Sequence, residues 1–511
     1  MNPEDRFARF AFSGAARADL RMKSVRGAMF TACGGAADVA LRVVSTLVLA
    51  RLLVPEHFGL IGMVIAVTGI AENLSSMGLF TATVQAPEIT HRQCSNLFWI
   101  NVGAGACCGL VICAMAPALS AFYGDGRLTA ITIAISTNFL WAGLTVQHAA
   151  LLHRQMRQPH ATANRLVANL LSLCVAVILA LGGLGYWALV WREITRSFFV
   201  AAGVWLLCRW VPGLPSRGAR IGSLLRFGGD LTLTEFLISV ISRLDSLLIG
   251  KFAGPFALGL YRQGQNLMAP ISQVNAPIYS VSQPALSMLR TDPERYRRYY
   301  QRILFVVALA TIPFGAFTAI YAQEIALVVL GEKWIGTAVF LQILGVAAII
   351  RPAMGTSGIV LITTGRSRRF LALVLAHSLV LALLMAIGIP WGAEGIVLAH
   401  VSTSALFILP NLYYSFAGTP VSVADFFKVV SRPFFASALM VIVLAALRGI
   451  VPLGNGVACL SVGCGTAIVV YGASLSIFPG GWLQLRALSQ DVLAALRHQY
   501  SRAEGVEAPA E

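Results

Sequence analysis

Apolar runs of about twenty residues, separated by short polar stretches, fill most of the chain. Twenty helical residues cross the hydrocarbon core of a bilayer, whereas a membrane β-strand needs about ten residues of alternating polarity. The pattern therefore predicts an all-α polytopic membrane protein with about fourteen transmembrane helices. The expected spans are residues 26–50, 57–83, 95–119, 127–148, 162–182, 185–208, 224–250, 256–283, 302–322, 335–362, 370–390, 393–413, 430–450 and 456–478.

Basic residues gather in every second connection between these spans. The N-terminal tail at 1–25 is basic, and so are the connections after the fourth, sixth, eighth and tenth spans. The alternate connections carry one basic residue or none. The positive-inside rule places the basic side in the cytoplasm, so both termini, including the tail at 479–511, are predicted to be cytoplasmic.

Two hairpins two hundred residues apart share one pattern. Residues 49–60 align with 249–260 without a gap, and the match pairs Pro55 with Pro255. The hairpins at 182–189 and 392–399 also match each other, and each joins an odd-numbered span to an even-numbered one. We therefore expect a parallel repeat of six plus six spans. The predicted organisation is an N-lobe at 26–208, a cytoplasmic linker at 209–223, a C-lobe at 224–413 and two further helices within 430–478.

Composition agrees with a membrane protein and excludes several classes. The chain is 57% hydrophobic and 12% charged, with a mean hydropathy of +0.75, whereas soluble domains are about 25% charged. Loop arginines account for the net charge of +16, so we expect no nucleic-acid partner. The cysteines and histidines lack metal-ligand spacing, and no nucleotide-binding or catalytic motif occurs. We expect no metal, no cofactor and no enzymatic activity.

Charged residues inside the spans are the candidates for function, since burying charge in a bilayer is costly. Arg192 and Arg196 lie deep in one span, and Arg351 lies in another. Guanidinium groups bind phosphate and carboxylate through paired hydrogen bonds, so these three arginines suit an anionic substrate. Asp38 and Arg42 are spaced i,i+4, and they can instead pair with each other.

Several motifs occur in an order that resembles the Wzx-type polysaccharide flippases. They are ARLLVPEHFGL at 50–60, LRFG at 225–228, RLDSLLIGK at 243–251, ALGLY at 257–261, DPER at 292–295 and LGEKW at 330–334. These flippases belong to the multidrug/oligosaccharidyl-lipid/polysaccharide exporter superfamily. The subgroup that the chain resembles transports exopolysaccharide, colanic acid and teichuronic acid precursors.

The resemblance implies two six-helix lobes around a central cavity that opens alternately to each side of the bacterial inner membrane. The implied function is a flippase for undecaprenyl-pyrophosphate-linked oligosaccharide repeat units in exopolysaccharide or lipopolysaccharide biosynthesis. The implied partners are this lipid-linked substrate, membrane lipid, a polysaccharide polymerase, and chain-length and export proteins. The implied substrate-binding cations are Arg42, Arg192, Arg196, Arg262 and Arg351.

Two alternatives remain open from the sequence. A cation-coupled small-molecule antiporter of the same fold would have an acid-dominated cavity. A membrane polysaccharide polymerase or glycosyltransferase would need a sizeable loop or soluble region, which the spacing of the spans does not leave. The acids that are candidates for ion coupling are Asp38, Glu72, Asp230 and Glu235.

Overall fold

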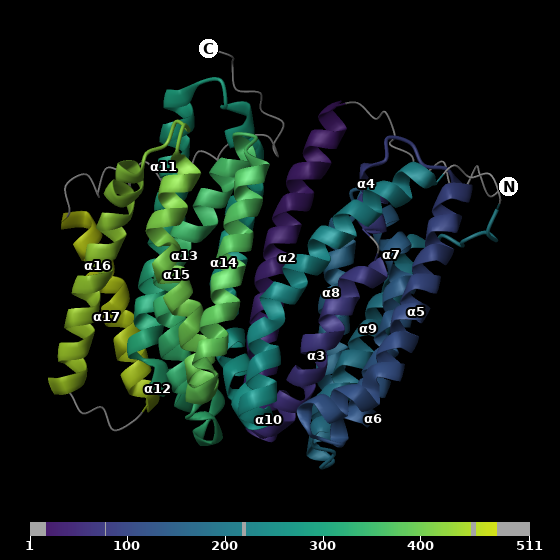
Figure 1. Ribbon diagram of the computed structural model, residues 1–511, viewed down its shortest axis with the longest axis horizontal. Helices are drawn as coiled ribbons and strands as arrows, with labels where there is room; N and C mark the ends of the chain where they lie inside the picture. Colours follow the sequence, from purple (N-terminus) through teal and green to yellow (C-terminus); the bar gives the residue numbers. More distant parts are fainter. Residues whose placement is uncertain (1–16, 77, 217–220, 451–455, 478–511) are drawn as a thin grey trace. The chain divides into compact units, whose positions relative to one another are not determined.

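The computed structural model describes residues 17–76, 78–216, 221–450 and 456–477 (Figure 1). All regular elements within these ranges are helical. This confirms the predicted all-α class, since a backbone in lipid must satisfy its own hydrogen bonds. Most of the predicted N-terminal tail and the whole predicted C-terminal tail lie outside the described residues.

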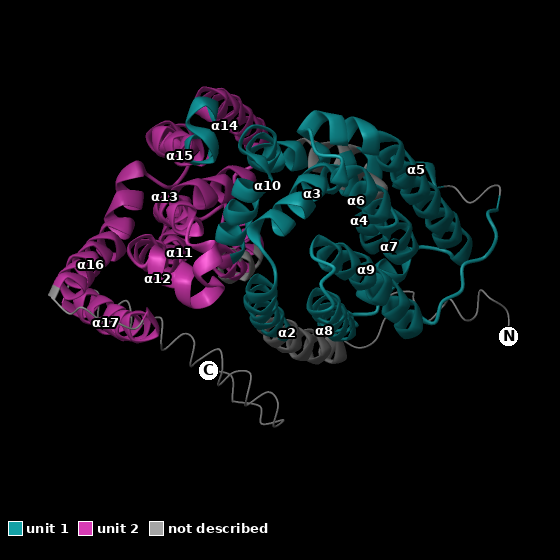
Figure 2. Ribbon diagram, turned by 90° about the horizontal axis from the view of Figure 1, so that it is seen from below, with its two compact units in different colours: residues 1–266, 389–396 teal, residues 267–388, 397–511 magenta. Residues whose placement is uncertain are grey.

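Contacts divide the chain into two compact units, coloured separately in Figure 2. Unit 1 comprises residues 1–266 and 389–396, and unit 2 comprises residues 267–388 and 397–511. The division falls inside a long helix, whereas the sequence placed the lobe boundary at 209–223. The difference arises because residues 224–266 pack against helices of unit 1.

The helices of unit 1 cover the predicted N-lobe spans, in places as two shorter helices. A left-handed Gly78, with φ of 57°, begins a new helix inside the predicted second span, and the predicted fourth span is divided at Thr137. The helices are α2 (Arg17–Leu52), α3 (Pro55–Ser76), α4 (Leu79–Gln85), α5 (His91–Tyr123), α6 (Arg127–Ser136), α7 (Asn138–Arg154), α8 (Gln158–Leu181), α9 (Tyr186–Cys208) and the first part of α10 (Gly222–Met288).

Helix α10 joins two predicted spans, 224–250 and 256–283, through a break at Gly254. Gly254 has φ of 81° and ψ of 178°, a conformation that glycine adopts without the steric cost a Cβ would add. The segments of α10 on both sides of this break run close along α3. A Cβ on Gly62 would lie 2.6 Å from Cδ of Arg262, and a Cβ on Gly69 would lie 2.2 Å from Cζ of Arg243. Small residues on α3 thus leave room for two arginines of α10.

Unit 2 is built around α11, which packs against α13 and α16. The buried Tyr296 and Tyr300 side chains of α11 form hydrogen bonds of 2.7 and 3.1 Å with Thr363 and Thr356 of α13. The elements after α10 are α11 (Pro293–Ile320), α12 (Ala322–Ile325), η2 (Ala326–Leu330), η3 (Glu332–Trp334), α13 (Thr337–Thr363), α14 (Ser367–Gly388), η4 (Ile389–Trp391), α15 (Gly392–Phe416), α16 (Val423–Ile450) and α17 (Gly456–Ile477).

Within the described residues, eight helical segments are long and apolar enough to cross a membrane. They are His91–Tyr123, Arg127–Arg154, Gln158–Leu181, Pro293–Ile320, Thr337–Thr363, Ser367–Phe416, Val423–Gly449 and Gly456–Ile477. Many large apolar side chains on these segments are exposed, Leu110, Leu379 and Ile468 among them. Such surfaces suit contact with lipid, so the chain is a multi-pass membrane protein.

Candidate functional site

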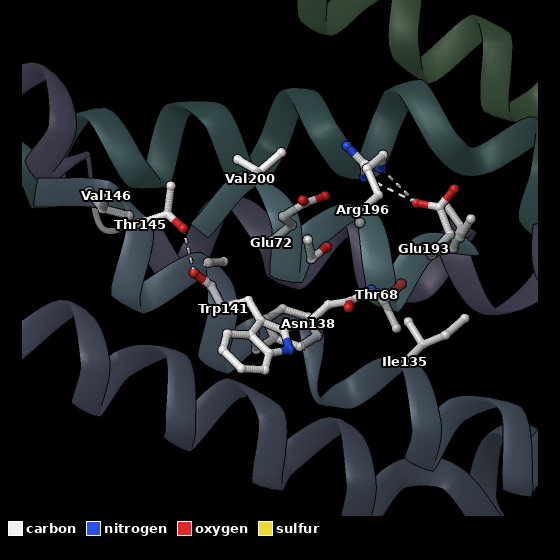
Figure 3. Close-up of a pocket in the computed structure, with 15 residues that line it drawn as sticks. Thr68, Glu72, Ile135, Asn138, Trp141, Thr145, Val146, Glu193, Arg196 and Val200 are labelled. Carbon is white, nitrogen blue, oxygen red and sulfur yellow. Dashed lines mark hydrogen bonds and ion pairs between the residues drawn. The ribbon is translucent and has the colours of Figure 1, made fainter. Parts of the chain in front are cut away.

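A cavity of about 470 Å³ lies inside unit 1, between α3, α6, α7 and α9 (Figure 3). Its walls combine apolar side chains with hydroxyl, amide, carboxylate, guanidinium and indole groups. The lining residues are Ile65, Thr68, Gly69, Glu72, Ile135, Asn138, Phe139, Trp141, Ala142, Thr145, Val146, Glu193, Arg196, Ser197 and Val200.

Helix α9 brings an ion pair to this cavity. Nη2 of Arg196 donates a 3.0 Å hydrogen bond to Oε2 of Glu193, one helical turn away, and Nε donates a second of 3.2 Å to the same oxygen. The side chain of Arg196 is 40% exposed and that of Glu193 is 21% exposed. Residues at i and i+3 of a helix are neighbours on its surface, so the pair is held by α9 alone.

Helix α3 supplies a second carboxylate. Glu72 lies one turn after the buried Thr68, and both side chains line the cavity. Glu72 also interacts electrostatically with Arg196. Two carboxylates therefore share one guanidinium among the lining residues, which makes this part of unit 1 rich in hydrogen-bond acceptors.

Helix α7 forms the wall with Asn138, Trp141 and Thr145, whose spacing places them on one helical face (Figure 3). The indole of Trp141 packs edge-on against Phe198 of α9, with ring centroids 5.1 Å apart. The hydroxyl of Thr145 donates a 2.7 Å hydrogen bond to the Trp141 carbonyl. Among the described residues, nothing donates a hydrogen bond to the buried Oδ1 atom of Asn138.

Arginines predicted from the sequence lie around α9. Arg192 lies within electrostatic range of Glu193, of Arg196 and of Arg42 on α2. Its Nε atom is buried and donates to no acceptor among the described residues. Arg262 interacts electrostatically with Glu193, and its Nη1 atom lies 3.4 Å from the Gly62 carbonyl oxygen.

The carboxylate of Asp38 interacts with one side chain on its own helix, α2, and with one on α8. Its carboxylate lies 3.6 Å from Arg42 and accepts a 2.8 Å hydrogen bond from Asn169. The pairing of Asp38 with Arg42 that their i,i+4 spacing allows is thus present. The Arg42 side chain is nevertheless 51% exposed, which leaves much of its guanidinium surface accessible.

The remaining predicted residues lie elsewhere. Arg351 is exposed on α13 in unit 2, near Tyr279. Asp230 and Glu235 belong to α10, and their side chains lie outside the described part of the structure. Unit 1 therefore contains Arg42, Arg192, Arg196 and Arg262, together with the acids Asp38 and Glu72.

Sequence reasoning missed the α7 wall. Asn138 and Trp141 lie in an expected span, and neither carries a charge that would draw attention. The available signal was weak: their three-residue spacing places an amide and an indole on one helical face. Among the described residues, no group of three or more histidine, cysteine, aspartate or glutamate side chains could hold a metal ion.

His148, one of the histidines without metal-ligand spacing, is packed among the helices of unit 1. Its ring stacks on Trp205 with centroids 4.1 Å apart. Its Nε2 atom lies 3.1 Å from the carbonyl oxygen of Trp210. His148 is fully buried among aromatic rings, and a stacked, hydrogen-bonded ring of this kind stabilises the helix packing of unit 1.

Comparison with curated proteins finds relatives that are named for lipopolysaccharide, teichuronic acid and succinoglycan biosynthesis. The chain is 26% identical to the lipopolysaccharide biosynthesis protein WzxC of Escherichia coli, over 68% of this chain and 71% of the relative. It is 24% identical to the teichuronic acid biosynthesis protein TuaB of Bacillus subtilis, over 59% and 63%. It is 23% identical to the succinoglycan biosynthesis transport protein ExoT of Rhizobium meliloti, over 58% and 60%.

Solved structures show the same fold. The lipid II flippase MurJ in an inward closed conformation matches with a TM-score of 0.70 and 12% identity, over 89% of this chain and 98% of the other. An inward-facing multidrug resistance transporter of the MATE family, in the MOP superfamily, matches with a TM-score of 0.56 and 15% identity, over 74% and 93%. The family profile described as polysaccharide biosynthesis protein matches residues 48–339, more than half of the chain, so this chain belongs to the polysaccharide biosynthesis protein family.

Proposed function

We propose that this protein is a flippase that moves lipid-linked oligosaccharide repeat units across the bacterial inner membrane. Membership of the polysaccharide biosynthesis family supports this function, as do relatives named for lipopolysaccharide biosynthesis and succinoglycan transport. The MurJ-like fold is suitable for such a task. The protein acts as a transporter and carries out no reaction on the sugars.

The observation that carries the proposal is the group of arginines around α9. Arg192 lies near Arg42 and Arg196, and its Nε atom makes no hydrogen bond among the described residues. Arg42 and Arg196 are paired with Asp38 and Glu193, so among the described residues Arg192 is the arginine of the three whose charge is left for a further anion to balance. A pyrophosphate supplies that anion, with oxygens that accept paired hydrogen bonds from guanidinium groups.

The rest of the substrate has a simple physical requirement. The sugars need a polar path, whereas an undecaprenyl chain can stay in the bilayer throughout.

We infer fourteen crossings, cytoplasmic termini and alternating access between two lobes. In this scheme Arg351 of the C-lobe contacts the substrate. The acids Asp38, Glu72, Asp230 and Glu235 are proposed to couple transport to an ion gradient.

The decisive experiment replaces Arg192 and Arg196 by Ala, separately and together, in a strain that lacks the chromosomal gene. Charge-assisted hydrogen bonds contribute about 1.5–3 kcal/mol each, so the double variant should lower polysaccharide export by about tenfold or more. Lipid-linked repeat units should then accumulate on the cytoplasmic side. The matched control is Arg165→Ala, an exposed arginine on α8.

Membrane levels of each variant are measured by immunoblot, so that a folding defect is separated from a transport defect. Normal export by the double variant at normal membrane level would refute the role of the arginines. Normal polysaccharide in the deletion strain itself would refute the proposed function.

A second candidate, a cation-coupled antiporter, is favoured by one observation. The cavity lining contains two carboxylates, Glu72 and Glu193, but one guanidinium. An antiporter predicts that the deletion strain becomes sensitive to cationic drugs and that Glu72→Gln alone reproduces this sensitivity. A flippase predicts unchanged drug sensitivity together with the loss of polysaccharide.

A further inference from the structure

We infer that the cavity of unit 1 is a subsite for an uncharged sugar of the repeat unit, with the indole of Trp141 as its stacking surface. This inference rests on the proposed function and deepens it. It divides the substrate in two: the sugar enters between α3, α7 and α9, and the pyrophosphate lies beside Arg192 and Arg42.

The size and lining of the cavity suit a sugar. Its volume of about 470 Å³ lies within the range of about 300–1,000 Å³ that is typical of small-molecule sites. Apolar walls with a few convergent polar groups are also typical of such sites. A pyranose ring needs this combination, because its hydroxyl groups project around a ring whose faces consist of C–H groups.

Trp141 is held in a fixed position for stacking. Its edge-on contact with Phe198, at 5.1 Å and an interplanar angle of 81°, restrains the ring. Its helix α7 is packed in turn against α5 and α9. An aromatic face carries partial negative charge that attracts the C–H groups of a sugar face. A restrained ring loses little conformational entropy when the ligand binds.

The polar groups of the cavity include hydrogen-bond acceptors that the hydroxyl groups of a sugar can satisfy. The buried Oδ1 atom of Asn138 receives no hydrogen bond among the described residues, and native proteins seldom leave such an acceptor unsatisfied. Thr145 already uses its hydroxyl proton on the Trp141 carbonyl, so its oxygen remains an acceptor. Glu72 adds carboxylate oxygens from the facing helix. A sugar offers several O–H donors to these acceptors.

The charge balance favours a neutral sugar over an acidic one. Glu193 is paired with Arg196, and Glu72 shares that same guanidinium. The lining thus has one carboxylate in excess, which would repel a uronic acid or a phosphate. A hexose or an N-acetylhexosamine meets no such repulsion. The anion is left to the arginines outside the lining, Arg192 and Arg42.

The test measures binding of three probes to the purified full-length protein in detergent. The first is the lipid-linked repeat unit extracted from a polymerase-deficient strain of the source bacterium. The second is undecaprenyl pyrophosphate, which has no sugar. The third is the free oligosaccharide released from the first probe by mild acid. Native mass spectrometry or thermophoresis gives the affinity of each.

Trp141→Ala should weaken binding of both sugar-containing probes by about tenfold, equal to about 1.4 kcal/mol, and should leave undecaprenyl pyrophosphate binding unchanged. Trp141→Phe should restore most of the affinity, and Asn138→Leu should weaken the sugar probes alone. Arg192→Ala should weaken the two pyrophosphate probes alone. Trp191→Ala, an exposed tryptophan on α9, is the matched control.

An equal loss for all three probes in Trp141→Ala would assign the residue a structural role and overturn the subsite. Unchanged sugar binding in Trp141→Ala and Asn138→Leu would overturn it too. If sodium alone binds, and Glu72→Gln abolishes that binding, the cavity is an ion site instead. Failure of the wild-type protein to bind either lipid probe would refute the proposed function and the subsite together, whereas failure of the Trp141 prediction alone leaves the flippase function intact.

Discussion

Gly59 and Gly259, which occupy equivalent positions in the two repeated hairpins, each face the carbonyl oxygen of the proline in the other hairpin. A Cβ on Gly59 would lie 1.6 Å from the oxygen of Pro255, and a Cβ on Gly259 would lie 1.9 Å from the oxygen of Pro55. The sequence repeat is therefore also a reciprocal contact, with the same residue pair used in both directions.

This contact makes a sharp prediction for alanine substitutions. Alanine at a helical glycine ordinarily stabilises a helix by up to about 1 kcal/mol. Gly59→Ala and Gly259→Ala should instead destabilise the protein by about 1–3 kcal/mol, because the Cβ meets backbone that cannot rotate away. Thermal unfolding in detergent measures the change. Gly103→Ala on α5, where a Cβ would meet nothing within 4 Å, should be neutral or stabilising; a similar loss there would refute the steric explanation.

The Glu193–Arg196 pair should show energetic coupling. Arg196→Ala leaves the mostly buried Glu193 carboxylate without its guanidinium partner, whereas Glu193→Gln removes that unpaired charge. A double-mutant cycle on thermal stability should therefore give a coupling of about 0.5–1 kcal/mol, a modest value because Arg196 is 40% exposed. Strictly additive effects would show that solvent screens the pair completely.

The predicted orientation can be tested with single cysteines. In a background without native cysteines that still exports polysaccharide, Lys333→Cys should react with an impermeant maleimide in intact cells. Arg295→Cys should react only after the membrane is permeabilised. Both positions are exposed at helix ends, and the positive-inside rule places them on opposite sides. Equal labelling of the two in intact cells would overturn the predicted topology.

The fold was predictable because its signals are local. Twenty-residue apolar runs are sufficient to predict helices in lipid, and the left-handed glycine at 254 separates the spans that were expected on either side of it. The grouping of residues 224–266 with unit 1 was not predictable. It depends on Gly62 and Gly69 accepting arginines of α10, a contact between helices nearly two hundred residues apart.

The candidate site was predictable only in its charges. Arg192 and Arg196 stand out because charge within an apolar run is rare. Trp141 and Asn138 do not, since an indole or an amide in a membrane helix is ordinary until a cavity is seen beside it. The sequence also does not show that Arg196 pairs with Glu193. Side-chain geometry was needed to find this ion pair.

Unit 2 offers a last prediction at the start of α16. The Asp425 side chain is 5% exposed. It accepts hydrogen bonds from the Ser422 hydroxyl at 2.7 Å and from Gln301 at 3.0 Å, and it is paired with Arg297. Asp425→Ala should lower stability by about 1–3 kcal/mol, because three part-buried hydrogen bonds lose their buried acceptor. Arg297→Ala should cost less, because Ser422 and Gln301 still satisfy the carboxylate.

Thermal unfolding in detergent measures both variants, and Lys428→Ala, an exposed residue one turn further along α16, is the matched control. Asp425 lies outside the residues matched by the family profile, 48–339. The loss should therefore appear in stability and membrane level, while the export per folded molecule remains that of the wild type. A greater loss for Arg297→Ala than for Asp425→Ala would show that the ion pair, and not the hydrogen-bond network at the helix start, anchors α16 to α11.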